Sequence, residues 1–185
     1  MQTTNDDRLV VENARFGERF VFGPATKGAF VFDFFVAPKS GMPMLHTHAK
    51  QSEVFRCRRG AITVLLADGA KVLRPGDEVE LAPGTFHAFE NRGDAEVECE
   101  VEYRPAGRSR EWLLLTNALE RATGKEPGLL DLAPFILDVD IFIKGPPIWM
   151  QRAIFGALRP IATLLGRRER ALRIAAEMYG PAFAW

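Results

Sequence analysis

Short β-forming runs dominate the chain up to about residue 105. Residues 29–36 (AFVFDFFV) are apolar on both faces except at Asp33. Residues 61–66 (AITVLL) lead to the turn signal Asp68-Gly69, after which residues 71–73 resume an extended pattern, so a hairpin is predicted. Many short strands with tight turns and no intervening helix predict an antiparallel barrel or sandwich.

The clearest alternation covers residues 96–103. Apolar and acidic residues take turns at every position, which predicts a half-buried strand with a solvated acidic face. The apolar positions are Val97, Cys99, Val101 and Tyr103, and the acidic positions are Glu96, Glu98, Glu100 and Glu102.

After Arg104-Pro-Ala-Gly107 the period becomes helical. Ser109 is expected to cap a helix that ends at Gly124 and repeats apolar residues at Trp112, Leu115, Leu119 and Ala122. Residues 148–165 predict a second helix, bent or restarted near Pro160. Residues 167–179 predict a third, with an apolar face of Leu172, Ala175, Ala176 and Tyr179. We therefore expect two parts: a β-barrel over residues 1–107 and a helical extension over residues 108–185.

Charge and composition exclude some classes of function. Lysine plus arginine and aspartate plus glutamate both number 24, a balance that argues against nucleic acid as a partner. The N-terminal MQTTNDDRLV lacks the features of a secretory signal, and charged residues and Pro160 make residues 148–165 a poor membrane span. Cys57 and Cys99 are too few for a disulfide framework, so we expect free thiols and a cytoplasmic location.

All three histidines lie between residues 46 and 87. His46 and His48 are two apart, so on a strand both imidazoles project from one face. Glu53 follows closely, and His87 comes just after Pro83-Gly84-Thr85-Phe86. Three imidazoles and one carboxylate suit one divalent transition metal ion, whether Fe, Mn, Ni, Cu or Zn.

Two stretches resemble the paired motifs of the cupin superfamily. Gly41-Met-Pro-Met-Leu-His46-Thr-His48, followed by Glu53 and Gly60, resembles the first, and residues 76–91 (GDEVELAPGTFHAFEN) resemble the second. Two departures touch loops rather than ligand positions: four residues instead of five separate Gly41 from His46, and Ala82 stands where the family usually has proline.

The resemblance implies a mainly β fold, a cupin (double-stranded β-helix, jelly-roll) barrel, followed here by the helical extension. It implies metal ligation by His46, His48, Glu53 and His87, with Glu53 able to double as a general base. Gly60, Gly76 and Gly84 are expected at sharp turns, and Asp77 and Asn91 are expected to stabilise turns through side-chain hydrogen bonds.

Strand parity suggests what else lines the barrel. If Glu53 and His87 point inward, so do Phe55, Cys57 and Phe89, which would suit an apolar or aromatic small molecule. The alternative for each of them is plain core packing, and for Cys57 a packed thiol.

Two functions stay open at this point. One is a metal-dependent enzyme, of dioxygenase or isomerase type, acting on a small apolar or aromatic substrate. The other is a non-catalytic sensor or binding protein with a cupin pocket; a transcription factor is disfavoured because no helix-turn-helix is recognisable. For the helical extension we rank packing or homodimerisation first and a lid second. A helix lying on a membrane ranks third, because residues 148–165 lack a strongly basic polar face.

Overall fold

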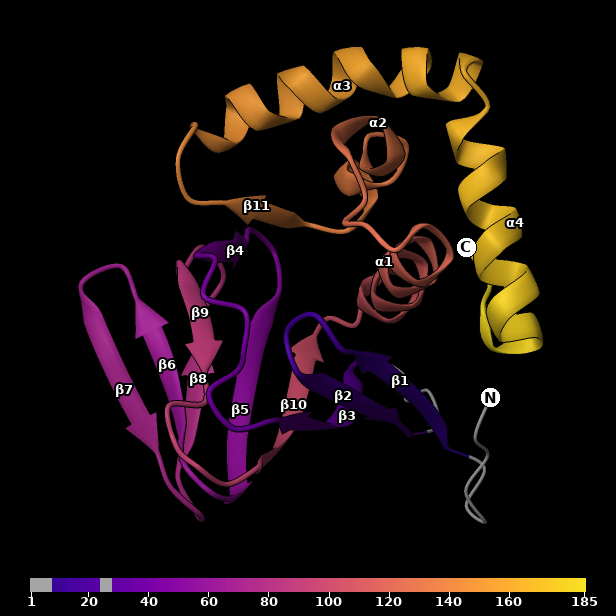
Figure 1. The fold of residues 1–185 in the computed structure, drawn as a ribbon. Helices are drawn as coiled ribbons and strands as arrows, with labels where there is room; N and C mark the ends of the chain where they lie inside the picture. The colour runs from indigo at the N-terminus through magenta and orange to yellow at the C-terminus, as the bar shows by residue number, and fades with distance from the viewer. Residues whose placement is uncertain (1–7, 24–27) are drawn as a thin grey trace. The chain divides into compact units, whose positions relative to one another are not determined.

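The structure, a computed structural model, describes residues 8–23 and 28–185. Residues 1–7, which make up most of the N-terminal stretch discussed above, lie outside the described residues. The chain divides into two compact units, Met1–Gly107 and Arg108–Trp185. The first is built of strands and the second mainly of helices (Figure 1).

The β unit consists of two antiparallel sheets. One has the strand order β1-β2-β3-β10-β5-β8, and the other has the order β4-β9-β6-β7 within this unit. This is the predicted mainly β, double-stranded β-helix architecture. The strands are β1 (Leu9–Asn13), β2 (Glu18–Phe22), β3 (Phe30–Val36), β4 (His46–His48), β5 (Ser52–Arg59), β6 (Ile62–Leu66), β7 (Gly69–Leu73), β8 (Glu78–Leu81), β9 (His87–Glu90) and β10 (Val97–Arg104).

An aromatic cluster covers much of the buried face of the six-stranded sheet. Alternate residues of β2 and β3 are buried, because successive side chains of a strand point to opposite faces. Phe20 and Phe34 stack with ring centroids 5.1 Å apart, and Phe30 and Phe32 lie 4.9 Å apart. Aromatic burial of this kind is a large part of the hydrophobic stabilisation of a small barrel.

The predicted hairpin between β6 and β7 is present, with a shifted turn. Leu66 pairs with Gly69, so Ala67 and Asp68 form the two-residue turn and Gly69 already belongs to β7. The predicted alternation of β10 is also present at Val97, Cys99 and Val101, which are buried.

The outer face of β10 differs from the solvated acidic face that was expected. Arginines of the neighbouring β5 cover it: Arg56 bonds Glu100 and Glu102, and Arg58 bonds Glu100. Glu102 is only 6% exposed. Antiparallel pairing of β5 with β10 places these opposite charges on adjacent strands, where they neutralise each other.

The helical unit contains α1 (Ser109–Thr123), α2 (Leu129–Leu132), β11 (Ile141–Ile143), α3 (Ile148–Leu164) and α4 (Arg167–Tyr179), with short 3-10 turns at Ile136–Asp138 and Gly180–Ala182. Within this unit α4 packs against α1 and α3. Tyr179 of α4 donates a hydrogen bond to Asn117 of α1, and burial raises the pKa of Tyr179 to about 12.

Three details of the helices differ from expectation. Ser109 is the first helical residue rather than the cap, since the N-cap is Arg108 and no side chain caps it. The buried stripe of α1 is made by Leu114, Leu115, Ala118 and Leu119, whereas Ala122 is exposed. In α4 the buried residues are Ala171, Ala175 and Tyr179, while Ala176 is exposed. Gly124 ends α1 in the left-handed conformation, as predicted.

Helix α3 runs through Pro160 without a restart. Proline removes the hydrogen bond to the carbonyl four residues earlier, here that of Gly156. Gly156 and Pro160 are both exposed, so water can satisfy that carbonyl and the helix need not break.

Candidate metal centre

The histidines come from two neighbouring strands of one sheet. β4 consists of His46, Thr47 and His48, and its two-residue period turns both imidazoles to the same face. β9 begins at His87, which is paired in register with His46. The rings of His46 and His87 lie 4.5 Å apart, centroid to centroid.

A glycine turn delivers His87 to this position. Gly84 has φ +87°, a left-handed conformation that glycine adopts without strain. Its N–H donates to the carbonyl of His48 at 2.8 Å, and Thr85 N–H donates to the carbonyl of Ala82 at 3.1 Å. The turn therefore ties the start of β9 to the end of β4, and the sharp turn predicted at Gly84 is present.

Glu53 approaches from the other sheet, where it is the second residue of β5. One potential ligand atom from each of His46, His48, Glu53 and His87 lies within 4.8 Å of the others. All four side chains are buried, with Glu53 and His87 only 2% exposed. The fold thus brings together the complete set of side chains that the motifs indicated.

Backbone carbonyls orient two of the rings. His46 Nδ1 donates to the carbonyl of Met44 at 3.1 Å, and His87 Nδ1 donates to the carbonyl of Thr85 at 3.0 Å. A proton on Nδ1 leaves Nε2 for the centre of the cluster, which is the usual orientation of metal-binding histidines. His87 Nε2 lies 2.8 Å from a carboxylate oxygen of Glu53.

Burial and mutual charge shift the pKa values in this cluster. Burial, together with the charge of His87, lowers the pKa of His46 to about 4, so this ring is neutral at physiological pH. Burial alone would lower the pKa of His87 and raise that of Glu53. The bond between them reverses both effects: the pKa of His87 is raised, and His48 and His87 hold the pKa of Glu53 well below its usual range.

The cluster fits a bound cation. Both ring nitrogens of His48 are buried and neither makes a hydrogen bond; the nearest carboxylate oxygen of Glu53 is 3.5 Å from Nε2. Leaving buried polar atoms unsatisfied is costly, and a cation at the centre would satisfy one of them. Three nitrogen donors and one carboxylate form a donor set suited to a divalent first-row transition metal.

Of the three residues suggested to line a substrate pocket, Phe55 and Phe89 lie close together and Cys57 lies away from Glu53. Phe55 and Phe89 are buried with ring centroids 5.8 Å apart, and Phe89 also lies 5.0 Å from Phe34. Cys57 is four residues beyond Glu53 along β5, about 13 Å at the rise of a strand. Its pairing partner is Cys99 on β10, so Cys57 is not among the side chains gathered around Glu53.

Sequence reasoning placed Tyr103 on the inner face of its strand but missed its relation to the cluster. Tyr103 pairs in register with Glu53, and its hydroxyl lies within hydrogen-bonding reach of that carboxylate. Its ring meets the His48 ring edge-on at 5.2 Å and stacks on Phe30 at 6.3 Å. Burial and the charge of Glu53 raise the pKa of Tyr103 well above its usual value. Only the strand register, which no motif encodes, could have revealed this pairing.

Comparison with known proteins gives the fold a family. The model of the cupin domain matches residues 32–101, a range that contains all four residues of the cluster. No curated protein matches the sequence significantly.

Several solved structures are similar at low identity. A sugar phosphate isomerase of the cupin superfamily from Silicibacter pomeroyi is 22% identical, with 54% of this chain and 71% of that chain covered and a TM-score of 0.47. KdgF from Halomonas sp. is 17% identical, with 55% and 92% covered and a TM-score of 0.48. Streptomyces PAC13 with uridine is 17% identical, with 57% and 82% covered and a TM-score of 0.46. Motifs, two-sheet topology and the family match agree, and this protein contains a domain of the cupin superfamily.

Proposed function

We propose that the protein is a metal-dependent enzyme acting on a small apolar or aromatic organic substrate, by a dioxygenase- or isomerase-type reaction. The observation that carries the proposal is the buried convergence of three imidazoles and one carboxylate within 4.8 Å. A pure binding module has no need of such a complete donor set, whereas a metal-dependent catalyst does.

His46, His48, Glu53 and His87 would hold one divalent transition metal ion. When bound, the metal would supply a Lewis acid or redox centre for a substrate that reaches it. The carbonyls of Met44 and Thr85 fix the orientation of the His46 and His87 rings before any metal arrives. This preorganisation supports a metal site because little side-chain freedom remains to be lost on binding.

The protonation states suggest roles for individual side chains. Glu53 has a lowered pKa, so it favours service as an anionic ligand over service as a general base, which works best with a pKa near the operating pH. The general-base role of Glu53 stays a prediction. Tyr103 has a raised pKa and remains a neutral phenol, able to donate a hydrogen bond beside the cluster.

The aromatic surroundings support the proposed class of substrate. Tyr103 joins the histidine cluster to the stacked rings of Phe30 and Phe32, and Phe55 and Phe89 lie further along the interior. Aromatic walls with few polar groups are typical of sites for apolar ligands.

Metal analysis tests the proposal directly. Elemental mass spectrometry of the purified protein should find near-stoichiometric iron, manganese, copper, nickel or zinc, and the His46→Ala/His87→Ala double variant should lose it. Glu53→Gln should weaken metal binding, because it removes the carboxylate of the donor set. Glu80→Gln, on the exposed side of β8, is its matched control and should retain the metal. A redox-active metal directs the assay to oxygen uptake with aromatic and 1,3-dicarbonyl compounds, and zinc directs it to isomerisation.

A protein that is purified without metal and cannot be reconstituted would refute the metal site. The alternative, a non-catalytic small-molecule-binding or sensor protein, would then lead. Homodimerisation and a cytoplasmic location stay predictions. Among the described helices, none combines the length and hydrophobicity that crossing a bilayer requires.

A further inference from the structure

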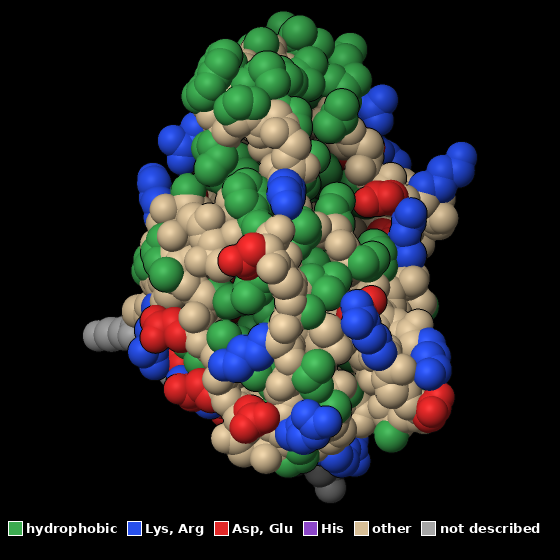
Figure 2. Space-filling view, turned by 90° about the vertical axis from the view of Figure 1, so that its left-hand side faces the viewer, with side chains coloured by type: hydrophobic (Ala, Val, Ile, Leu, Met, Phe, Trp, Pro, Cys, Tyr) green, Lys and Arg blue, Asp and Glu red, His purple; other side chains and the backbone are tan. Residues whose placement is uncertain are grey.

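Helix α3 leaves an apolar face uncovered. Only Gln151 and Ala162 of its residues are buried. Apart from Arg152, its large exposed side chains are all apolar. Leu165, which directly follows the helix, extends this group. The exposed apolar residues are Trp149 (70% exposed), Ile154 (45%), Ile161 (50%), Leu164 (88%) and Leu165 (60%). Figure 2 shows hydrophobic side chains gathered over α3, at the top of the view. Scattered apolar residues on a surface are ordinary, but a contiguous group marks an interaction site.

The helical period shows how wide this face is. At about 100° per residue, the exposed apolar positions from Trp149 to Leu165 fall within about half of the helix circumference. Small exposed residues, Ala153, Gly156, Ala157 and Pro160, fill the space between the large ones. The two charged residues of α3, Arg152 and Arg159, project from outside this half, so the face itself carries no charge.

The start of the helix is held firmly. Gln151 is buried, and its amide accepts from Ile143 N–H at 3.2 Å and donates to the carbonyls of Ile143 and Pro146 at 2.9 and 2.7 Å. These bonds clamp the turn that precedes α3. Trp149 is therefore presented to solvent from a fixed turn, which lowers the entropic cost of using it as an anchor.

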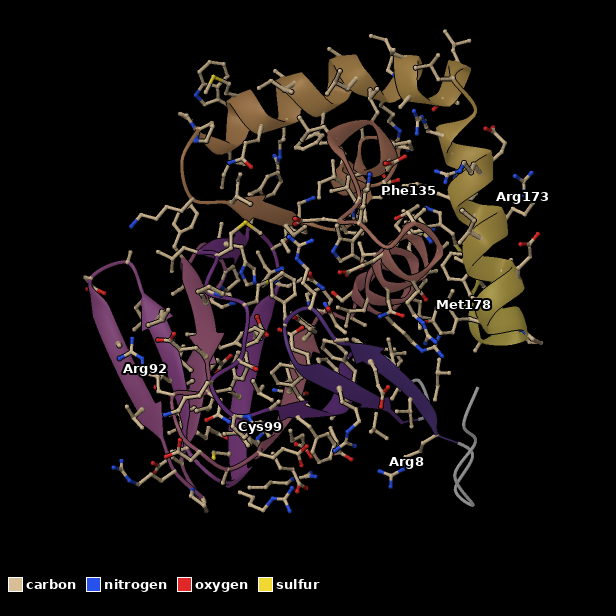
Figure 3. All side chains as sticks on the ribbon, in the orientation of Figure 1. Arg8, Arg92, Cys99, Phe135, Arg173 and Met178 are labelled. Carbon is tan, nitrogen blue, oxygen red and sulfur yellow. The ribbon has the colours of Figure 1, made fainter. Side chains whose placement is uncertain are left out.

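Positive charge is concentrated around this face. Residues 138–177 contain seven lysines and arginines and four acidic residues, Asp138, Asp140, Glu169 and Glu177, a net charge of +3 in a chain whose total is zero. Lys144 lies just before the helix and four arginines follow it in α4, of which Arg173 projects into solvent (Figure 3). Arg159 and Arg167 are partly neutralised by Asp138 and Asp131. Arg170 also lies 3.9 Å from Asp131, and Arg173 lies 3.9 Å from Glu177. The remaining three cations are Lys144 before the helix, Arg152 within it and Arg168 in α4.

Charge favours an anionic lipid surface over a second copy of the chain as the partner of this apolar face. A second copy of the chain would bring two such cationic segments together, and like charges across an interface oppose association. An anionic lipid surface matches both features, because cations lie at its headgroups and apolar side chains enter the acyl boundary. Tryptophan is also favoured at that depth.

We propose that the exposed face of α3, with the cations at its ends, binds the surface of an anionic lipid bilayer. The helix would lie in the plane of the headgroups. Its 17 residues span about 25 Å, a length suited to lying on the surface, and the arginines excluded from a span serve here as headgroup contacts. The basic character that residues 148–165 lack is supplied by the flanking residues. This inference is independent of the metal site.

Co-sedimentation of the full chain with vesicles tests the proposal. We expect binding to vesicles of phosphatidylcholine mixed with phosphatidylserine, little binding to phosphatidylcholine alone, and weakening by added salt. Trp149→Ser/Leu164→Ser should weaken binding about tenfold or more, because both anchors are lost. Leu129→Ser, an equally exposed apolar residue of α2, is the control and should bind like the parent protein.

Three outcomes would overturn the proposal. They are no binding to the anionic vesicles, equal binding by the Trp149→Ser/Leu164→Ser variant, and equal binding to vesicles with and without phosphatidylserine. Sedimentation velocity adds a decisive check. A parent protein that is dimeric and becomes monomeric in the double variant would assign the face to self-association instead. Because the substituted residues are exposed, thermal unfolding should show that the variant folds normally.

Discussion

Tyr103 of β10 lies directly opposite Glu53 of β5, with its hydroxyl within hydrogen-bonding reach of the carboxylate and its ring edge against His48. The pairing places a neutral phenol beside the only carboxylate of the cluster. A hydrogen bond from outside the ligand set orients a metal-binding carboxylate and fixes its charge. Tyr103 is therefore a positioning residue for the candidate metal centre.

Tyr103→Phe should weaken metal binding while leaving the fold intact. The ring stays to stack on Phe30, but the hydroxyl near Glu53 is lost, and outer contacts of this kind typically change metal affinity about 10–100-fold. Isothermal titration with Zn²⁺ or Mn²⁺ measures the change. Tyr179→Phe, which removes a phenol hydroxyl from the helical unit, is the control and should bind the metal normally. Unchanged affinity in Tyr103→Phe would exclude the positioning role.

Metal affinity should rise as the pH increases through the raised pKa of His87. His46 has a pKa of about 4 and is already deprotonated there, so it releases no proton. The pKa of His87 is raised, so below that pKa a metal must displace the proton on Nε2. Raising the pH removes this competitor, and affinity should increase up to about tenfold per pH unit until His87 is neutral.

Calorimetry in two buffers of different ionisation enthalpy would count the protons released. Metal binding should release protons at mildly acidic pH and fewer as the pH rises through the raised pKa of His87. Affinity that is constant over this range, with no proton released, would show that His87 is neutral before metal arrives and would contradict the raised pKa.

The sequence predicts the fold and the donor set more fully than it predicts the contacts between strands. Alternation identified β10 and placed His46 and His48 on one face of a strand, because both depend on a strand's two-residue period. The resemblance to the cupin motifs added Glu53 and His87 to the ligand set. The opposition of Tyr103 and Glu53 depends on register between strands 50 residues apart, and local sequence does not encode it. The arginine cover of the acidic face of β10 escaped prediction for the same reason.

The helical unit was harder to predict because its buried faces depend on tertiary packing. Ser109 has the chemistry of a cap, yet it is the first residue of the helix and Arg108 occupies the N-cap position. Apolar spacing alone also could not tell that α3 leaves its hydrophobic side exposed. Periodicity shows that a helix is amphipathic, whereas only the structure shows which face is covered.

Arg56 should contribute measurably to the stability of the β unit. It bonds Glu78, Glu100 and Glu102, and Glu102 is nearly buried. Arg56→Met keeps the apolar stem but removes a charged partner from Glu102, so we expect a loss of about 1–2 kcal/mol in urea unfolding. Arg104 still pairs with Glu102 in this variant. Adding Glu102→Gln should recover part of the loss, since it removes the buried carboxylate that has lost one of its two arginine partners.

Arg58→Met is the comparison variant for Arg56. Arg58 is more exposed and bonds Asp33 and Glu100, so its loss should cost less than about 1 kcal/mol. Equal costs for the two variants would show that the burial of Glu102 carries no extra weight.

The two thiols should be unreactive in the folded protein. Cys57 and Cys99 are buried neighbours on paired strands, and Figure 3 shows Cys99 within the β unit. Burial raises the pKa of both thiols, so both stay protonated. A protonated thiol is a poor nucleophile, because the thiolate is the reactive form. Ellman's reagent should label neither cysteine in buffer and both in denaturant. Rapid labelling of the native protein would show that the strands open there.

Asn91 should matter more to stability than an ordinary turn residue. Its side-chain amide donates to the carbonyls of Val36, Ala37 and Ala95, and its oxygen accepts from Gly93 N–H at 2.9 Å. Asn91 is 2% exposed, so Asn91→Ala removes the side-chain donor from three carbonyls, and the bond to the carbonyl of Val36 is fully buried. We expect a loss of about 2–4 kcal/mol in urea unfolding.

Asp77 supplies the contrast for Asn91, because both were expected to stabilise turns. Asp77 accepts one bond, from Arg74 N–H at 2.8 Å, and it is exposed, so water can replace it and Asp77→Ala should cost about 1 kcal/mol. A cost for Asn91→Ala no greater than that would mean that water reaches the carbonyls of Val36 and Ala37. In that event the Ser40–Asn91 bridge, which follows directly after β9, would open to solvent rather than form a rigid part of the barrel.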